Sequence, residues 1–227
     1  MMYVNRYTKT IRPEEKVIDL GSGDNPHPRA DIYVDFFDDG IHREGAKLVV
    51  PQQGQFIKWD LNKYPFPFKN KEFDFVICSH IIEHINNPAY FCNEIQRIGK
   101  RGYIETPNKL YEQIYGWSFH QWYVYALNDE LIFERKKGQD FFAPIGRKLY
   151  KYNKEFYEGH HKNIEQLLTS FYWEDSFSFK VIDSDTKSSK KWHYINEEEI
   201  NQELYQVPIK YPFFIKKFLN LFIQTKK

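Results

Sequence analysis

The chain has 227 residues, enough for one domain with an elaboration and too many to need disulfide staples. Its 32 basic and 31 acidic residues are interspersed, which excludes the one-sided positive charge of a nucleic-acid-binding domain. The two cysteines, Cys78 and Cys92, lack the spacing of a metal or redox pair, so we expect buried free thiols.

The first predicted elements are four short strands. They follow a polar segment, residues 1–10, that lacks the apolar stretch of a secretory signal, so we expect a cytoplasmic protein. The run at residues 16–20 is continuously apolar up to Asp19, which is typical of a strand buried on both faces, and residues 31–35, 56–60 and 73–79 predict three further strands. The first three runs carry an aspartate at or near their carboxyl ends, namely Asp19, Asp35 and Asp60.

A glycine turn, Gly21-Ser22-Gly23, follows the first strand. A strand that stops at such a turn needs an unobstructed backbone, because a ligand approaches it across the carboxyl ends of the sheet. A nicotinamide dehydrogenase would require a third glycine where this chain has Pro26, and its ribose acid would come later than Asp35. The dehydrogenase hypothesis is therefore disfavoured.

Strands and helices then alternate. Asn87 is a suitable N-cap and Pro88 suits the first position of a helix that we expect to end near Gly99. Residues 102–105 predict a fifth strand. This alternation indicates a parallel, doubly wound sheet.

The middle of the chain departs from this rhythm. Residues 121–127 and 130–134 predict a hairpin around Asn128-Asp129, and residues 147–158 are ambiguous. Residues 163–171 predict a short amphipathic helix, and residues 177–182 predict a late strand.

A C-terminal helix is predicted after Pro212. Its polar residues fall on one narrow arc, and its length of about 15 residues is too short to span a bilayer. Three alternatives remain: the helix packs on its own domain, forms a homodimer contact, or lies on a membrane surface.

Taken together, these segments resemble the class I S-adenosylmethionine-dependent methyltransferases, specifically the type-11 group. The resemblance is strong over residues 16–108 and weakens afterwards. No single segment is specific, but all occur in order at family spacing. They are residues 17–23, Asp35, 59–61, 65–68, 73–76, 82–85, 94–100 and 103–108.

The resemblance implies a Rossmann-like, doubly wound, mostly parallel seven-stranded α/β sheet with an inserted hairpin as an aromatic lid. It implies a single domain, with a core at residues 12–110 and 160–183, a substrate-side insertion at 111–158 and a helical tail at 194–227. The implied cofactor is S-adenosylmethionine, and the product is S-adenosylhomocysteine.

The resemblance also implies roles for the strand ends. The backbone of Gly21, Ser22 and Gly23 would reach the methionine end of the cofactor, with Asp19 ordering that loop or receiving the amino group. Asp35 would accept both ribose hydroxyls, as a carboxylate can do with its two oxygens. For the two glycines and Asp35, an ordinary turn and simple solvation are the alternatives.

Further cofactor contacts are implied by the same family pattern. Phe36 would stack on the adenine, Asp60 would accept its exocyclic amine, and the Leu61 amide would address the ring. Ser79 and His80 would lie under the methionine and the sulfonium. Helix capping or solvation is the alternative for Asp60.

Candidate catalytic residues are His120 and Glu105. His120 lies among aromatic residues, where partial desolvation would favour the neutral ring that accepts a proton. The alternative is that His120 simply packs in an aromatic cluster, and we expect His84 to be a hydrogen-bonded structural histidine. The adjacent pair His160-His161 would point apart on a helix, so we expect no metal site.

The resemblance implies a methyltransferase that acts on a hydroxyl or amine of a small molecule. A sugar, a nucleotide-sugar or a lipid-linked glycan intermediate fits the aromatic lid and the neutral charge. The alternative is a non-catalytic S-adenosylmethionine-binding partner subunit of another enzyme. We expect no nucleic-acid partner, with peripheral membrane contact or a homodimer as alternatives for the C-terminal helix.

Overall fold

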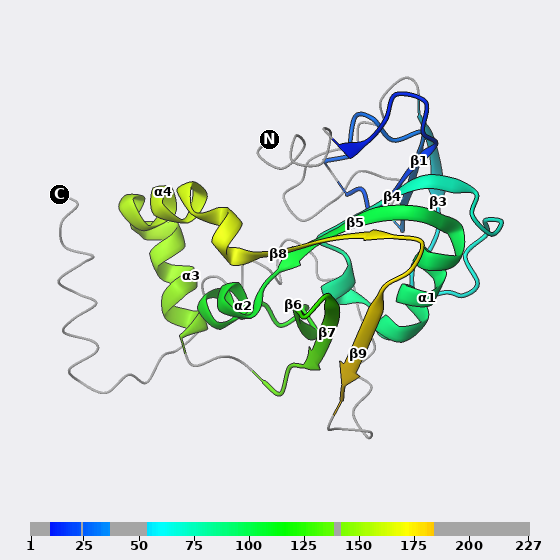
Figure 1. Cartoon of the computed structure of the whole chain (residues 1–227). Helices are drawn as coiled ribbons and strands as arrows, with labels where there is room; N and C mark the ends of the chain where they lie inside the picture. Colours follow the sequence, from blue (N-terminus) through cyan, green and yellow to red (C-terminus); the bar gives the residue numbers. More distant parts are fainter. Residues whose placement is uncertain (1–9, 24, 37–53, 139–141, 184–227) are drawn as a thin grey trace, which may run out of the picture.

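The computed structural model describes residues 10–23, 25–36, 54–138 and 142–183, which form a mixed α/β fold (Figure 1). The helices are α1 (Pro88–Ile98), α2 (Lys109–Tyr115), α3 (Ala143–Tyr152) and α4 (Lys154–Lys162), with short 3-10 helices η2 (Ile82–His84) and η3 (Ile164–Leu167). The strands are β1 (Val17–Leu20), β2 (Ile32–Asp35), β3 (Gln55–Lys58), β4 (Phe73–Ser79), β5 (Gly99–Pro107), β6 (Trp122–Leu127), β7 (Glu130–Arg135), β8 (Leu168–Glu174) and β9 (Ser178–Ile182).

The central sheet has six strands in the order β3-β2-β1-β4-β5-β8. Strands β1 to β5 are parallel, and β8 runs antiparallel to β5. The chain adds β2 and β3 on one side of β1 and then returns to place β4 on its other side. This reversal creates a switch point between β1 and β4, where ligands of open α/β sheets bind. The mostly parallel α/β sheet is therefore confirmed.

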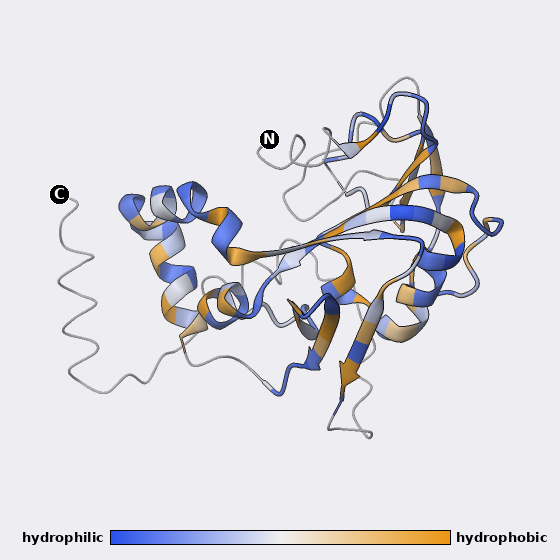
Figure 2. Cartoon of the chain, viewed as in Figure 1, coloured by the Kyte–Doolittle hydropathy of each residue, from blue (hydrophilic) through white to orange (hydrophobic). Residues whose placement is uncertain are grey.

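Both faces of the central sheet are buried. Ile18, Val76 and Ile104 lie in the larger apolar cluster on one face, whereas Val17 and Phe75 belong to a second cluster on the other. Successive residues of a strand point to opposite faces, so continuous apolar runs are what such strands need. Figure 2 shows hydrophobic residues along β1 and β4, in contrast to the mainly hydrophilic α4.

Helix α1 covers the face that holds the larger cluster. The Asn87 side chain accepts a hydrogen bond from the Tyr90 amide, and Pro88 occupies the first turn, so the predicted cap is confirmed. Phe91, Ile95 and Ile98 are buried in the same cluster as β1 and β4. Among the described residues, α1 is the only helix that connects two neighbouring parallel strands.

A second sheet packs against the same cluster in the order β6-β7-β9. The predicted hairpin is confirmed: Asn128 and Asp129 form its turn with φ of 50° and 61°, values that Asn and Asp tolerate well. Trp122 anchors the sheet, because its buried indole N–H donates to the Ile85 carbonyl at 2.7 Å. The hairpin is thus a packed layer and not a separate arm.

Two predicted elements differ from the structure. The helix predicted at residues 163–171 is wrong: only η3 is helical, and β8 begins at Leu168. Thr169, Phe171 and Trp173 are buried, whereas Ser170, Tyr172 and Glu174 are exposed, a period of two that suits an edge strand. The predicted late strand is present as β9, but it pairs with β7 in the second sheet; the described residues give the central sheet six strands, and the count of seven stays a prediction.

Helices α2, α3 and α4 lie together at one side of the molecule, next to the N-terminal end of β8 (Figure 1). The ambiguous residues 147–158 belong to α3 and α4. The division into a core and an insertion stays a prediction, and the tail at residues 194–227 lies outside the described residues. Within the described ranges, no helix is long and apolar enough to cross a membrane.

Candidate functional site

The carboxyl ends of β1 and β4 meet at the switch point of the central sheet. A Cβ atom at Gly21, which follows β1, would lie only 2.7 Å from the Ile81 side chain, which follows β4. Two groups of residues flank this contact. We call residues 19–23 with Asp35 the glycine side, and we call His80, Glu83, His84, Glu112 and His120 the histidine cluster.

The glycine side is shaped by its backbone. Gly21 and Gly23 have φ of 73° and 54°, in the left-handed region that favours glycine. The Gly21 amide donates to the Val34 carbonyl at 2.8 Å, and the Gly23 amide donates to Asp35 Oδ2 at 2.9 Å. Asp35 is buried at the end of β2 and therefore holds the loop against the neighbouring strand.

Two observations show that the glycine side fits a small polar ligand. The Ser22 hydroxyl is buried and has no hydrogen-bond partner among the described residues. Among the described residues, a Cβ added at Gly23 would meet only the Gly21 carbonyl oxygen, at 3.9 Å, so none of the described side chains crowds the backbone there. Buried polar atoms normally have partners, and an unpartnered hydroxyl beside such an uncrowded backbone fits the polar end of a cofactor.

Asp19 is buried beneath this loop. Its Oδ2 accepts a hydrogen bond from the His27 amide at 2.8 Å. Burial raises the pKa of Asp19 to about 7, the His27 amide opposes this rise, and the Asp35 carboxylate adds to it. The structure thus places Asp19 where it can order the loop, while its ionisation is unfavourable without a positive partner.

The residues predicted for the adenine are more dispersed. Phe36 directly follows Asp35 and its ring is exposed, whereas the Leu61 side chain is buried in the core. Strand β3 ends at Lys58, not at Asp60 as expected. Asp60 lies in the following turn, where its Oδ1 accepts from the Asn62 amide at 2.9 Å. That contact is an Asx-turn hydrogen bond and not the helix cap considered as an alternative for Asp60, and it occupies one carboxylate oxygen.

At the end of β4, the chain turns sharply at His80, which has a φ of 54°. The His80 amide donates to the Glu105 carbonyl at 2.8 Å, and the Glu105 side chain lies 3.6 Å from His80 Nε2 and 3.5 Å from Ser79 Oγ. Glu105 is fully buried within β5 and accepts from the Tyr103 hydroxyl at 2.6 Å. The structure therefore brings Glu105 together with Ser79 and His80.

The histidine cluster is centred on one carboxylate oxygen. Glu83 Oε1 lies 3.7 Å from His80 Nδ1, 3.8 Å from His84 Nε2 and 4.0 Å from His120 Nε2. The other oxygen, Oε2, accepts from the Thr106 hydroxyl at 3.0 Å. Glu83 and His84 reach this point from η2, whereas His120 reaches it from the segment before β6.

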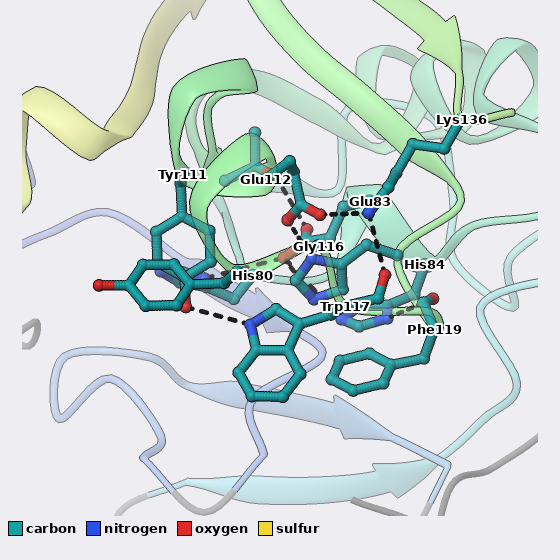
Figure 3. Close-up of polar contacts among 12 residues, drawn as sticks. His80, Glu83, His84, Tyr111, Glu112, Gly116, Trp117, Phe119 and Lys136 are labelled. Carbon is teal, nitrogen blue, oxygen red and sulfur yellow. Dashed lines mark hydrogen bonds and ion pairs between the residues drawn. The ribbon is translucent and has the colours of Figure 1, made fainter. Parts of the chain in front are cut away.

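A buried ion pair supports the cluster from behind (Figure 3). Glu112 on α2 bonds His120 Nδ1 with one oxygen and Lys136 Nζ with the other. Burial raises the pKa of Glu112 to about 7, against the opposing effect of the Lys136 ammonium. Lys136 also donates to the Trp117 carbonyl at 2.9 Å, so the pair ties α2 to the segment after β7.

Aromatic rings lie beside the cluster. Trp117 and Phe119 stack at 5.5 Å between centroids, and Phe119 stacks on His84 at 5.6 Å. The Trp117 indole donates to the Tyr111 hydroxyl at 3.4 Å, and all three aromatic residues are only half-buried. Figure 3 shows Tyr111, Trp117 and Phe119 around His80 and His84, so apolar ring faces adjoin the polar cluster.

Several of these residues were missed by sequence reasoning. Glu112 and Lys136 carry no motif, and only folding brings them to His120. The spacing of His80, Glu83 and His84 is a signal that could have been used, since H-x-x-E-H is a metal-binding pattern in some zinc proteases. The pair His160-His161 lies on α4, where His160 bonds the Tyr115 hydroxyl at 2.7 Å.

A family model described as a methyltransferase domain matches residues 32–104. The YcgJ protein from Bacillus subtilis is 20% identical, with 44% of this chain and 48% of that chain covered at a TM-score of 0.35. An S-adenosylmethionine-dependent methyltransferase from Archaeoglobus fulgidus is 23% identical, with 47% and 51% covered at 0.37. The methyltransferase bound to the Trm112 activator from Haloferax volcanii is 16% identical, with 51% and 64% covered at 0.39.

The chain spans about half the length of the first solved structures that it matches. No curated protein matches it significantly. The matched residues 32–104 run from the start of β2 into β5, the part of the sheet on both sides of the switch point. The methyltransferase-domain match thus falls on the parallel strands that surround the switch point.

Proposed function

We propose that the chain is an S-adenosylmethionine-dependent methyltransferase that acts on a hydroxyl or amine of a small molecule. The observation that carries the proposal is the glycine side, where the unpartnered Ser22 hydroxyl and the open backbone at Gly23 adjoin buried Asp35. These groups suit the amino-acid and ribose parts of the cofactor. Asp19 and Asp35 would bind them, with Phe36 beside the adenine.

The bound cofactor supplies an electrophilic methyl group on a sulfonium. The chain's own contribution is alignment and exclusion of water, since in-line transfer depends mainly on positioning. His80 is the most exposed member of the histidine cluster, with 34% of its side chain accessible. We assign His80 to contact with the acceptor, while buried Glu105 and His120 orient the cluster behind it.

The acceptor class is a further part of the proposal. Half-buried Tyr111, Trp117 and Phe119 offer aromatic faces next to the histidine cluster. Such faces pack against sugar rings, so a sugar, nucleotide-sugar or lipid-linked glycan suits this side of the site. Contacts through the C-terminal helix, with a membrane or a second copy, stay predictions because that helix lies outside the described residues.

Calorimetric titration with S-adenosylmethionine and S-adenosylhomocysteine tests the proposal. We expect micromolar binding, about −8 kcal/mol, for the wild type. Asp35→Asn removes a buried charge at the site, and we expect at least a tenfold loss of affinity. Asp129→Asn is the matched control, because it makes the same change in the exposed hairpin turn.

Failure of the folded wild type to bind either compound would overturn the proposal. Binding without transfer to any acceptor in a screen of sugars and glycan intermediates would favour the alternative, a non-catalytic binding subunit. Trp117→Ala tests acceptor binding separately from cofactor binding. We expect it to weaken use of the acceptor and to leave the affinity for S-adenosylmethionine nearly unchanged.

A further inference from the structure

The histidine cluster has the geometry of a metal site. Ligand atoms of Glu83, His84 and His120 all lie within 4.8 Å of one another, and the three residues are 1%, 2% and 5% exposed. The separations of 3.8 Å and 4.0 Å from Glu83 Oε1 to the two Nε2 atoms exceed hydrogen-bond lengths. Two ligands of one tetrahedral ion lie about 3.4 Å apart when each bond is about 2.1 Å. To bind an ion, the two Glu83–histidine separations would shorten by about 0.5 Å, and the separation between the two histidine ligand atoms, which is at most 4.8 Å, by up to about 1.4 Å.

The outer partner of His84 sets its tautomer. Its Nδ1 lies 3.3 Å from the Phe119 carbonyl oxygen. A carbonyl only accepts, so Nδ1 carries the proton and Nε2 presents its lone pair toward Glu83 Oε1. The stacked Phe119 ring holds the imidazole in this orientation. Metal-binding histidines are usually fixed by such a contact at the second nitrogen.

His120 has the same arrangement with a different partner. Its Nδ1 bonds Glu112, while its Nε2 faces Glu83 Oε1. Lys136 bonds the second Glu112 oxygen and favours the ionised carboxylate. In zinc proteins, a histidine that binds the metal with one ring nitrogen commonly donates the other N–H to a carboxylate, as His120 can do to Glu112.

Glu83 is oriented as a ligand would be. Its Oε2 accepts from the Thr106 hydroxyl at 3.0 Å, which fixes the carboxylate and directs Oε1 at the two histidines. All three candidate ligands thus have a partner at the atom that would not bind the ion. The alternative is a structural ion-pair network in which Glu83 pairs with the two histidines at these same distances, and metal titration distinguishes the two.

We propose that Glu83, His84 and His120 bind one divalent transition-metal ion of the zinc class. Two imidazoles and a carboxylate suit zinc, whereas magnesium and calcium prefer oxygen ligands throughout. Three protein ligands leave a position for water or substrate, and the partly exposed His80 lies at that edge of the cluster. The proposal departs from the sequence prediction of no metal site. Its role rests on the proposed function: the ion would orient the acceptor beside the cofactor.

Metal binding can be measured without any activity. The untagged full-length chain, stripped with a chelator, is titrated with Co²⁺ while visible absorption is recorded, and then with Zn²⁺. We expect one Co²⁺ per chain, with the d–d absorption of a low-coordinate nitrogen–oxygen site, and its loss when Zn²⁺ displaces it. No saturable uptake of either ion by the folded chain would overturn the proposal.

Variants locate the ion. Glu83→Gln preserves size but removes the charged ligand, and we expect at least a hundredfold loss of Zn²⁺ affinity. Glu112→Gln leaves the ligands in place but alters the partner of His120, with an expected loss of about 10- to 100-fold. His161→Gln is the matched control, because it removes a histidine from α4 outside the cluster. Circular dichroism checks that each variant is folded.

Two outcomes would place the ion elsewhere and overturn the assignment. One is undiminished binding by folded Glu83→Gln, and the other is loss of binding in His161→Gln. Calorimetry of the wild type with S-adenosylmethionine tests the proposed function separately. Zinc binding without cofactor binding would keep the metal site and refute the methyltransferase, and the reverse result would refute only the metal site.

Discussion

The two sides of the switch point are built in different ways. The glycine side uses residues that are close in sequence: Asp19, Gly21, Ser22 and Gly23 follow one another, and Asp35 lies one strand away. Its shape comes from positive φ values and from backbone amides that bond to β2. The local backbone therefore determines most of this half.

The histidine cluster and Lys136, which supports it, are assembled from distant segments. Glu83, Glu112, His120 and Lys136 come from η2, α2, the segment before β6 and the segment after β7. Every member of the cluster except the partly exposed His80 is buried, and each depends on a partner from another segment. We therefore expect the glycine side to tolerate the loss of a side-chain partner but not a change in backbone conformation. We expect the histidine cluster to tolerate local backbone changes but not the loss of a side-chain partner.

The largest expected effect is at Lys136. Lys136→Met leaves Glu112 buried without its cation, so we expect a loss of about 3 kcal/mol in the free energy of unfolding. Urea denaturation measures it. Lys109→Met, which breaks the more exposed pair with Glu134, should cost only about 0.5 kcal/mol. Equal losses in the two variants would contradict the expected difference between the buried and the exposed ion pair. Adding Glu112→Leu to Lys136→Met removes the unpaired carboxylate, so we expect it to recover part of the lost stability.

On the glycine side, the strongest test is Gly21→Ala. The φ of 73° strains any Cβ-bearing residue, and the new Cβ would lie 2.7 Å from the Ile81 side chain. We expect a loss of about 2 kcal/mol by chemical denaturation. Gly159→Ala in α4 is the control, because no neighbouring atom of the described residues lies within 4 Å of its Cβ position, and it should stabilise by up to about 1 kcal/mol.

A Gly21→Ala variant as stable as the wild type would contradict the view that backbone conformation determines the shape of the glycine side. Combining it with Ile81→Gly separates the two causes, because the second change removes the Cβ, Cγ1 and Cδ1 atoms that cause the overlap but not the backbone strain at residue 21. A partial recovery is the expected result.

Asp19→Asn tests the buried carboxyl beneath the loop. Because folding raises the pKa of Asp19 from 3.8 to about 7, the folded state binds its proton more tightly than the unfolded state. Wild-type stability should therefore fall as the pH rises from about 4 to about 7. Asp19→Asn should remove that fall and be more stable at pH 8 by about 2 kcal/mol.

Thermal unfolding of both proteins at pH 4.5 and pH 8 measures the difference. Near pH 4.5 the two should be similar, since Asp19 is protonated in the folded wild type. A stability gap that is the same at both pH values would contradict the assignment. Cofactor affinity should fall in Asp19→Asn, because the negative charge would be absent.

The smallest expected effect is at Ser22. Its buried hydroxyl has no partner among the described residues, so Ser22→Ala should leave stability unchanged or raise it by about 1 kcal/mol. S-adenosylmethionine affinity should fall about fivefold if the hydroxyl binds the cofactor, about 1 kcal/mol. A clear loss of stability with unchanged affinity would show instead that Ser22 serves the fold.

The sequence alone determined the parallel strands, the glycine turn and the capped helix α1. Continuous apolar runs, two glycines and the Asn87-Pro88 pair act through local sterics and burial, which a single sequence displays. The hairpin was predictable for the same reason, since Asn128 and Asp129 tolerate positive φ. Asp19 and Asp35 could be placed at one edge because parallel strands share their carboxyl ends.

Only the tertiary structure decided that residues 168–174 form an edge strand and that β9 joins the hairpin. Both depend on which strand offers free backbone groups, and local propensity does not contain that information. The same holds for His84 and His120, whose orientation depends on Phe119 and Glu112 from other segments. A buried charge requires a partner, but the sequence does not say which distant residue will provide it.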